Sequence, residues 1–185
     1  MGRRAVVAEI IGLAAASLWC GLLLTCGFVA ALIFPTMKSL SPQLPGFALY
    51  DGDHWRIAAG QFAAPMFGLL AWIQSLLALV IFLSCRIAGR RGMTAHLPSA
   101  AFMSALLSGF LVYRPMMNLI AGQWAAAAEG DSARAAASAL QFAAMHRWAS
   151  VSMSITLILA VASAAACAAA LLRAQPIAPA AAAWR

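Results

Sequence analysis

An apolar stretch in the second half of the chain carries three residues that could do chemistry. SGFLVYRPMMNLIAG (residues 108–122) contains Arg114, Pro115 and Asn118. An ionisable group inside a membrane span is costly, so by default it indicates a functional site. Pro115 removes a backbone donor and is expected to free a carbonyl near residue 111. Asn118 lies one turn from Arg114 on the same helix face, and together they predict a polar notch.

Two histidines and a serine could complete a binding site around this notch. His146 and Ser150 are four residues apart, so they share a helix face at the start of the last apolar segment. His54 precedes another apolar segment on the same expected side. The sequence therefore predicts one outward-facing, ligand-binding polar pocket formed by His54, Arg114, Asn118, His146 and Ser150.

The same residues allow an interpretation without a pocket. Arg114 and Arg147 could pair with lipid phosphates, and the two histidines could be ordinary interfacial residues. Trp55, Trp124 and Trp148 would then form an aromatic belt at the membrane surface.

Two further alternatives involve a cofactor or a metal. His54 and His146 could ligate a haem iron, as paired histidines do in helical bundles. Met and His side chains at the outer face could handle copper, because soft ligands suit Cu(I), although the chain has no M-x-x-M pattern. It also lacks G-x-S-x-G, H-E-x-x-H and P-loop motifs. We expect no enzymatic activity, and the sequence requires no cofactor.

The segments that position these residues are strongly apolar. Of 185 residues, 64% are hydrophobic and 9% are charged, whereas soluble domains average about 25% charged residues. The basic residues stand at the ends of apolar segments and form no patch, which argues against nucleic-acid binding. The four cysteines lie within or beside apolar segments, so a disulfide framework is not expected.

Four segments are long enough to cross a bilayer as helices, which takes about 20 apolar residues. They cover residues 8–34, 57–85, 98–122 and 145–172. We expect the first to end at Pro35. The predicted fold class is an all-α integral membrane protein, an antiparallel bundle of four transmembrane helices. It forms a single domain (1–172) followed by a disordered tail (173–185).

The charges predict an orientation. One side of the four spans carries Arg3, Arg4, Arg86, Arg90, Arg91, Arg173 and Arg185. The positive-inside rule then places both termini in the cytoplasm and the loops 35–56 and 123–144 outside. We expect the location to be the bacterial inner membrane. Glu9, at the cytoplasmic start of the first span, is expected to reach water, where the helix dipole favours it.

Local signals predict further structure. The second outer loop is expected to be helical in pieces, broken near Gly130, with Asp131 as the N-cap of a helix that continues into the last span. Small residues at spacing four are expected to face neighbouring helices. These rows are Ser17, Gly21 and Thr25; Ala101, Ala105 and Gly109; and Ala160, Ala164 and Ala168. The positions expected to be structural are Gly21, Pro65, Gly109 and Pro115.

Four stretches carry a family resemblance. They are LWCGLLLTCGFVAALIF (18–34), AGQFAAPMF (59–67), RPMMNLI (114–120) and FAAMHRWASVSMS (142–154). In their order they resemble the transmembrane-protein-205-like family, a four-span membrane domain of unknown function. His146 and Ser150 match its pattern, whereas Met145 replaces the usual leucine and Ser154 the usual asparagine. The resemblance implies a four-span membrane protein and supplies no established activity.

Two functions follow from these observations. The first is a multi-pass membrane protein that binds, or helps to move, a small ligand or ion through the outer pocket. The alternative is an accessory or structural subunit of a larger membrane complex. In both cases the expected partners are the lipid bilayer and either further copies of this chain or other membrane subunits.

Overall fold

The structure is a computed structural model that describes residues 1–174, and all its regular elements there are helical. The α-helices are α1 (Arg3–Leu40), α2 (His54–Ile87), α3 (Met93–Leu107), α4 (Arg114–Ala128) and α5 (Ser132–Ala174). A short 3-10 helix, η1 (Pro45–Phe47), precedes α2, and a π-helical segment, η2 (Ser108–Tyr113), joins α3 to α4.

Within residues 1–174, four helical rods are long and apolar enough to cross a membrane. They are α1, α2, the continuous run from Thr94 to Ala128, and α5. The prediction of four long apolar helices and a helical fold class is therefore confirmed for the described residues. The predicted tail lies outside the described residues, except for Arg173 and Ala174, which end α5.

The prediction that the first helix ends at Pro35 is wrong, because α1 continues through this proline to Leu40. A proline inside a helix removes one hydrogen bond and leaves one carbonyl without its helical donor. That loss is tolerable here because Ala31, Phe34 and Pro35 all lie on the exposed side of α1. The helix stops only at Ser41, which adopts a left-handed conformation with φ 44°. Pro65 likewise lies inside α2 without ending it.

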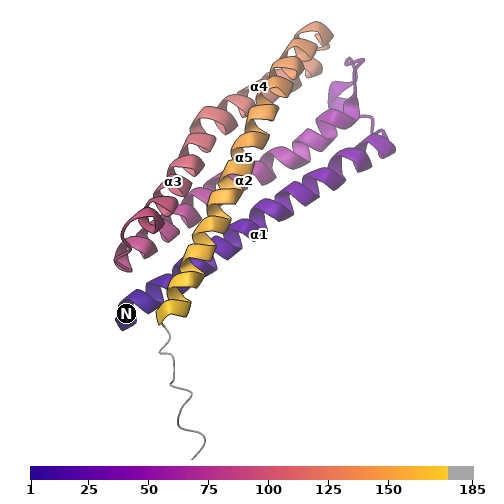
Figure 1. Cartoon of the computed structure of the whole chain (residues 1–185). Helices are drawn as coiled ribbons and strands as arrows, with labels where there is room; N and C mark the ends of the chain where they lie inside the picture. Colours follow the sequence, from indigo (N-terminus) through magenta and orange to yellow (C-terminus); the bar gives the residue numbers. More distant parts are fainter. Residues whose placement is uncertain (175–185) are drawn as a thin grey trace, which may run out of the picture.

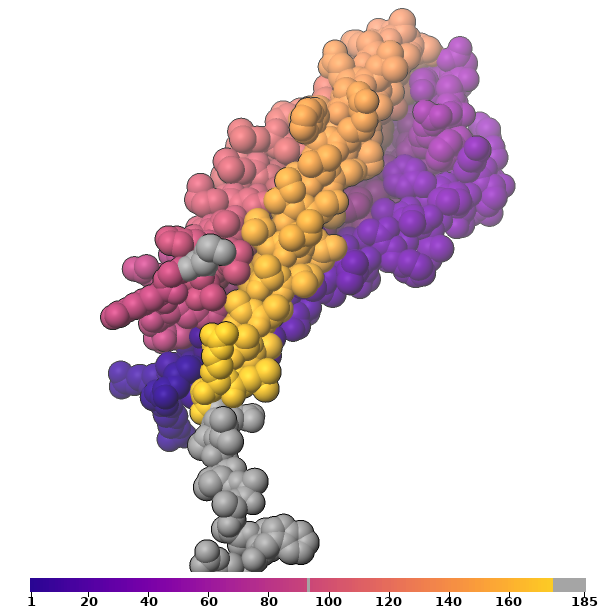
Figure 2. All heavy atoms as spheres, viewed as in Figure 1, coloured from indigo at the N-terminus to yellow at the C-terminus, as the bar shows by residue number. Residues whose placement is uncertain are grey.

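The helices form two antiparallel pairs that cross each other (Figure 1). α1 packs along α2, and α4 packs along α5, while the amino-terminal half of α1 also meets the carboxyl-terminal half of α5. Figure 2 shows α5 lying across one face of the molecule, between α3–α4 on one side and α1–α2 on the other.

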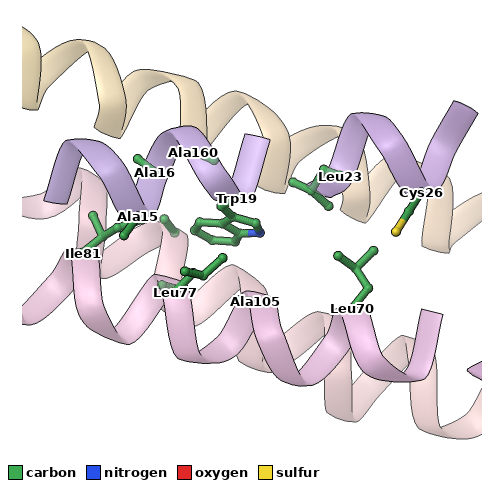
Figure 3. Packing of buried hydrophobic residues seen from close by; sticks show 12 residues of the cluster. Ala15, Ala16, Trp19, Leu23, Cys26, Leu70, Leu77, Ile81, Ala105 and Ala160 are labelled. Carbon is green, nitrogen blue, oxygen red and sulfur yellow. The ribbon is translucent and has the colours of Figure 1, made fainter. Parts of the chain in front are cut away.

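The core lies where these pairs cross, and Trp19 fills its centre (Figure 3). Small side chains surround this indole ring, including Ala15, Ala16, Ala105 and Ala160, which are all buried. Ala101 is buried as well, so the two alanines of the predicted row in the third rod pack inward, whereas in the fourth rod Ala160 is buried and Ala164 and Ala168 are half-buried. Small residues allow helix backbones to approach closely, which is how apolar helices gain contact in lipid.

The expected inward packing of the first small-residue row is wrong. Ser17, Gly21 and Thr25 are all exposed, and no atom lies within 4 Å of a Cβ placed on Gly21. Gly109, within η2, also has nothing within 4 Å of its Cβ position. Spacing identifies residues that share a face, but it does not say which face of an apolar helix turns inward.

The connection between α4 and α5 is as predicted. The chain turns at Gly130 (φ 75°), and the Asp131 carboxylate accepts a hydrogen bond from the Arg134 backbone N–H at 3.0 Å, which caps α5. The Ser132 hydroxyl donates to Asp51, so this turn also holds the loop before α2. Ile57, at the start of α2, is buried against Ala126 and Ala127 of α4 in a small second core.

Candidate functional site

The Arg-Pro sequence lies directly after a wide turn of helix. In η2 the backbone N–H of Arg114 donates to the carbonyl of Gly109, five residues earlier, as in a π-helix. Pro115 lacks an N–H and its ring would clash with the carbonyl of residue 111, so the preceding turn widens. The sequence prediction that Pro115 disturbs this turn is thereby confirmed. π-Turns occur often at functional sites.

A groove of about 590 Å³ opens beside this turn, between α4 and α5. Its lining residues are Pro115, Asn118 and Leu119 from α4 and Gln141, Ala144 and Met145 from α5. Two amides therefore face the same space from opposite helices, with an apolar surface around them. Each amide both donates and accepts hydrogen bonds and carries no charge, so the groove suits a neutral or amphipathic molecule better than a bare ion.

Of the five residues predicted to form one pocket, Asn118 alone lines this groove. Arg114 is exposed one turn before it on the same helix. Ser150 lies nine residues after Gln141, which at about 100° per residue places it on the opposite side of α5. His146 is also exposed, stacks on Phe142 with ring centroids 5.7 Å apart, and accepts the Ser150 hydroxyl on its carbonyl at 3.0 Å.

His54 has a structural role at the start of α2. Its Nδ1 accepts a hydrogen bond from the Leu44 backbone N–H at 3.1 Å, and its Nε2 lies 2.8 Å from the Tyr50 carbonyl, to which it donates. Both ring nitrogens therefore hold the loop before α2 in place, and neither is free to ligate a haem iron in this conformation. Within residues 1–174, no group of three or more His, Cys, Asp or Glu side chains is arranged to hold a metal ion.

The opposite end of the bundle contains a buried ion pair. Arg90 Nε donates to Glu9 Oε1 at 2.8 Å, and Arg90 Nη2 donates to the second carboxylate oxygen. The side chains are only 6% and 2% exposed, respectively. The expectation that Glu9 reaches water is wrong. Burial alone would lower the pKa of Arg90, but the hydrogen-bonded Glu9 raises it above its usual value, so the guanidinium stays charged.

Local backbone geometry brings Arg90 back over the helix ends. Gly89 and Gly92 adopt φ of 71° and 67°, a conformation that glycine reaches without strain. The Arg90 backbone N–H also donates to the Cys85 carbonyl at 3.3 Å. Spacing could not predict this pair, because its partners are 81 residues apart. The sequence indicated this pair only in that Glu9 and Arg90 carry opposite charges and were predicted on the same side of the membrane.

Tight packing surrounds the ion pair. A Cβ on Gly12 would lie 3.1 Å from the Cys167 sulfur and 3.4 Å from Ser84 Cβ, so any larger residue at this position of α1 would crowd α2 and α5. Cys85 and Cys167 are both buried free thiols, as expected for small apolar residues. Arg90 Nη1 and Ser163 Oγ are buried without a hydrogen-bond partner in the described part of the chain.

Comparisons with protein-family models, curated proteins and solved structures found no match for this chain.

Proposed function

We propose that the chain is a four-span protein of the bacterial inner membrane with both termini in the cytoplasm, and that it belongs with the transmembrane-protein-205-like proteins. Four helices of sufficient length and hydropathy support the membrane assignment. The arginines concentrated at one end of the rods support the orientation, because positive charge favours the cytoplasmic side.

Within this setting, we propose that the chain binds a small amphipathic molecule at the outer membrane interface without transforming it chemically. The groove between α4 and α5 is the observation that carries this function. Asn118 and Gln141 would hydrogen-bond the polar part of the ligand, and Leu119 and Met145 would contact its apolar part. Arg114, exposed one turn away, would attract a negatively charged group. The α4–α5 groove thus replaces the five-residue pocket as the centre of the binding hypothesis.

Native mass spectrometry of protein gently extracted from its own membrane tests this function. We expect the unmodified chain to retain a small molecule, and the variant Asn118→Leu/Gln141→Leu to lose it at least tenfold, because each hydrogen bond from these amides to the ligand is worth about 1 kcal/mol. Gln61→Leu is the matched control, since Gln61 is an exposed amide on α2 outside the groove. A bare unmodified chain, or equal retention by the double variant, would contradict the proposal.

One observation favours the second candidate function, that of a subunit in a larger assembly. The exposed row of Ser17, Gly21 and Thr25 gives α1 an outer face on which another helix could approach closely. A second copy of this chain would fit there through its own α1. This function is compatible with ligand binding, because the row and the α4–α5 groove lie on different helices.

A bulky residue in this row should prevent self-association. We expect Gly21→Leu to shift the chain from dimer to monomer in sedimentation measurements in mild detergent. Gly27→Leu is the control, because Gly27 is also exposed with nothing within 4 Å of its Cβ position but faces another direction on α1. A chain that is monomeric before substitution, or that responds equally to both changes, would exclude assembly through this row.

A further inference from the structure

A second cavity lies at the end of the bundle that carries the chain's amino terminus, between α1 and α2. Its volume is about 370 Å³. The residues that line it are Arg3, Arg4, Val7, Ala8, Ile11, Ser84 and Ile87. We propose that this cavity binds an anionic phospholipid of the leaflet that faces the amino terminus.

The polar end of the cavity is suited to a phosphate group. Arg3 and Arg4 are exposed, and neither makes an ion pair within residues 1–174. They stand in the first turn of α1, which contains no acidic residue and whose N-cap, Gly2, provides no side-chain hydrogen bond. Two free guanidinium groups and the uncapped backbone N–H groups of a 38-residue helix together favour an anion.

The rest of the cavity lining is apolar and therefore favours a lipid over a free phosphate. Val7 and Ile11 continue from the arginines along α1, each about one turn further, and Ile87 closes the cavity from the end of α2. All three are exposed apolar side chains. Free phosphate would gain nothing from this surface, whereas an acyl chain would cover it. Ser84, which is 6% exposed, adds a hydroxyl from the buried side.

Lipid titration of the purified full-length chain, followed by native mass spectrometry, tests the site. We expect phosphatidylglycerol to bind more tightly than phosphatidylcholine. Arg3→Gln/Arg4→Gln should weaken phosphatidylglycerol binding about 30-fold, because each basic residue beside anionic lipid is worth about a factor of five. Both side chains are exposed, so the variant should fold normally.

The matched control is Arg86→Gln/Arg91→Gln. It removes two exposed arginines from the same end of the molecule that do not line the cavity. An equal loss in this control would show only general attraction to anionic lipid and would overturn the proposal. Equal binding of phosphatidylcholine would also overturn it. Displacement by inorganic phosphate at the same concentration would indicate a plain anion site instead of a lipid site.

Discussion

Replacing Glu9 by alanine should destabilise the protein by about 3–5 kcal/mol, since removal of one partner leaves a buried charge without compensation. Arg90 holds both carboxylate oxygens of Glu9, and its side chain is only 6% exposed. Without Glu9 the guanidinium would be left in an apolar site beside Cys85 and Cys167. The measurement is the free energy of unfolding in mixed detergent micelles.

The double variant Glu9→Leu/Arg90→Met separates charge pairing from packing. It removes both charges and keeps similar volume, so we expect it to recover most of the lost stability. Glu129→Ala is the control, because the Glu129–Arg134 pair is largely exposed and should contribute little. If the double variant is as unstable as Glu9→Ala, the ion pair is itself a net source of stability and our reasoning on its cost is wrong.

Local signals predicted the parts of the fold that depend on neighbouring residues. Length and hydropathy were sufficient for the four rods. Gly130 and Asp131 marked the end of α4 and the cap of α5, because turn and cap preferences act within a few residues. Pro115 predicted the disturbed turn for the same reason, since its missing N–H affects the carbonyls just before it.

Features that depend on helix rotation could not be predicted in this way. The rods are apolar on all sides, so the sequence does not indicate which face turns inward. For example, Gly21 faces outward, whereas Ala105 and Ala160, from the equivalent rows of other helices, face inward. For the same reason, the sequence could not show that Asn118 and Ser150 face different directions. Asn118 lines the α4–α5 groove, and Ser150 lies on the far side of α5.

Contacts between distant segments were also missed. The pairing of Glu9 with Arg90 requires α1 and the turn after α2 to meet, which no spacing rule reports. The residue type of His54 and its predicted side of the membrane suggest a ligand-binding role. In the folded chain its two nitrogens are used by the loop, a role that depends on how residues 44–50 fold back.

Trp19→Ala should be the second strongly destabilising change, by about 3–5 kcal/mol, because the indole ring fills the crossing of the helix pairs. Trp19 is fully buried, and the residues around it are mostly small (Figure 3). The side chains of Ala15, Ala105 and Ala160 are single methyl groups fixed to the backbone, so they cannot swing into the space left behind. The same unfolding measurement would detect this loss, and Trp72→Ala is the control, since Trp72 is 81% exposed.

Trp19→Phe should cost much less than Trp19→Ala, because two effects oppose each other. The smaller ring leaves part of the space unfilled, which is unfavourable. The indole Nε1, however, is buried without a hydrogen-bond partner in the described residues, and phenylalanine removes that unpaired donor. If Trp19→Phe were as destabilising as Trp19→Ala, Nε1 would have to make a hydrogen bond in the membrane. The core at the crossing would then be polar at its centre, contrary to the packing argument.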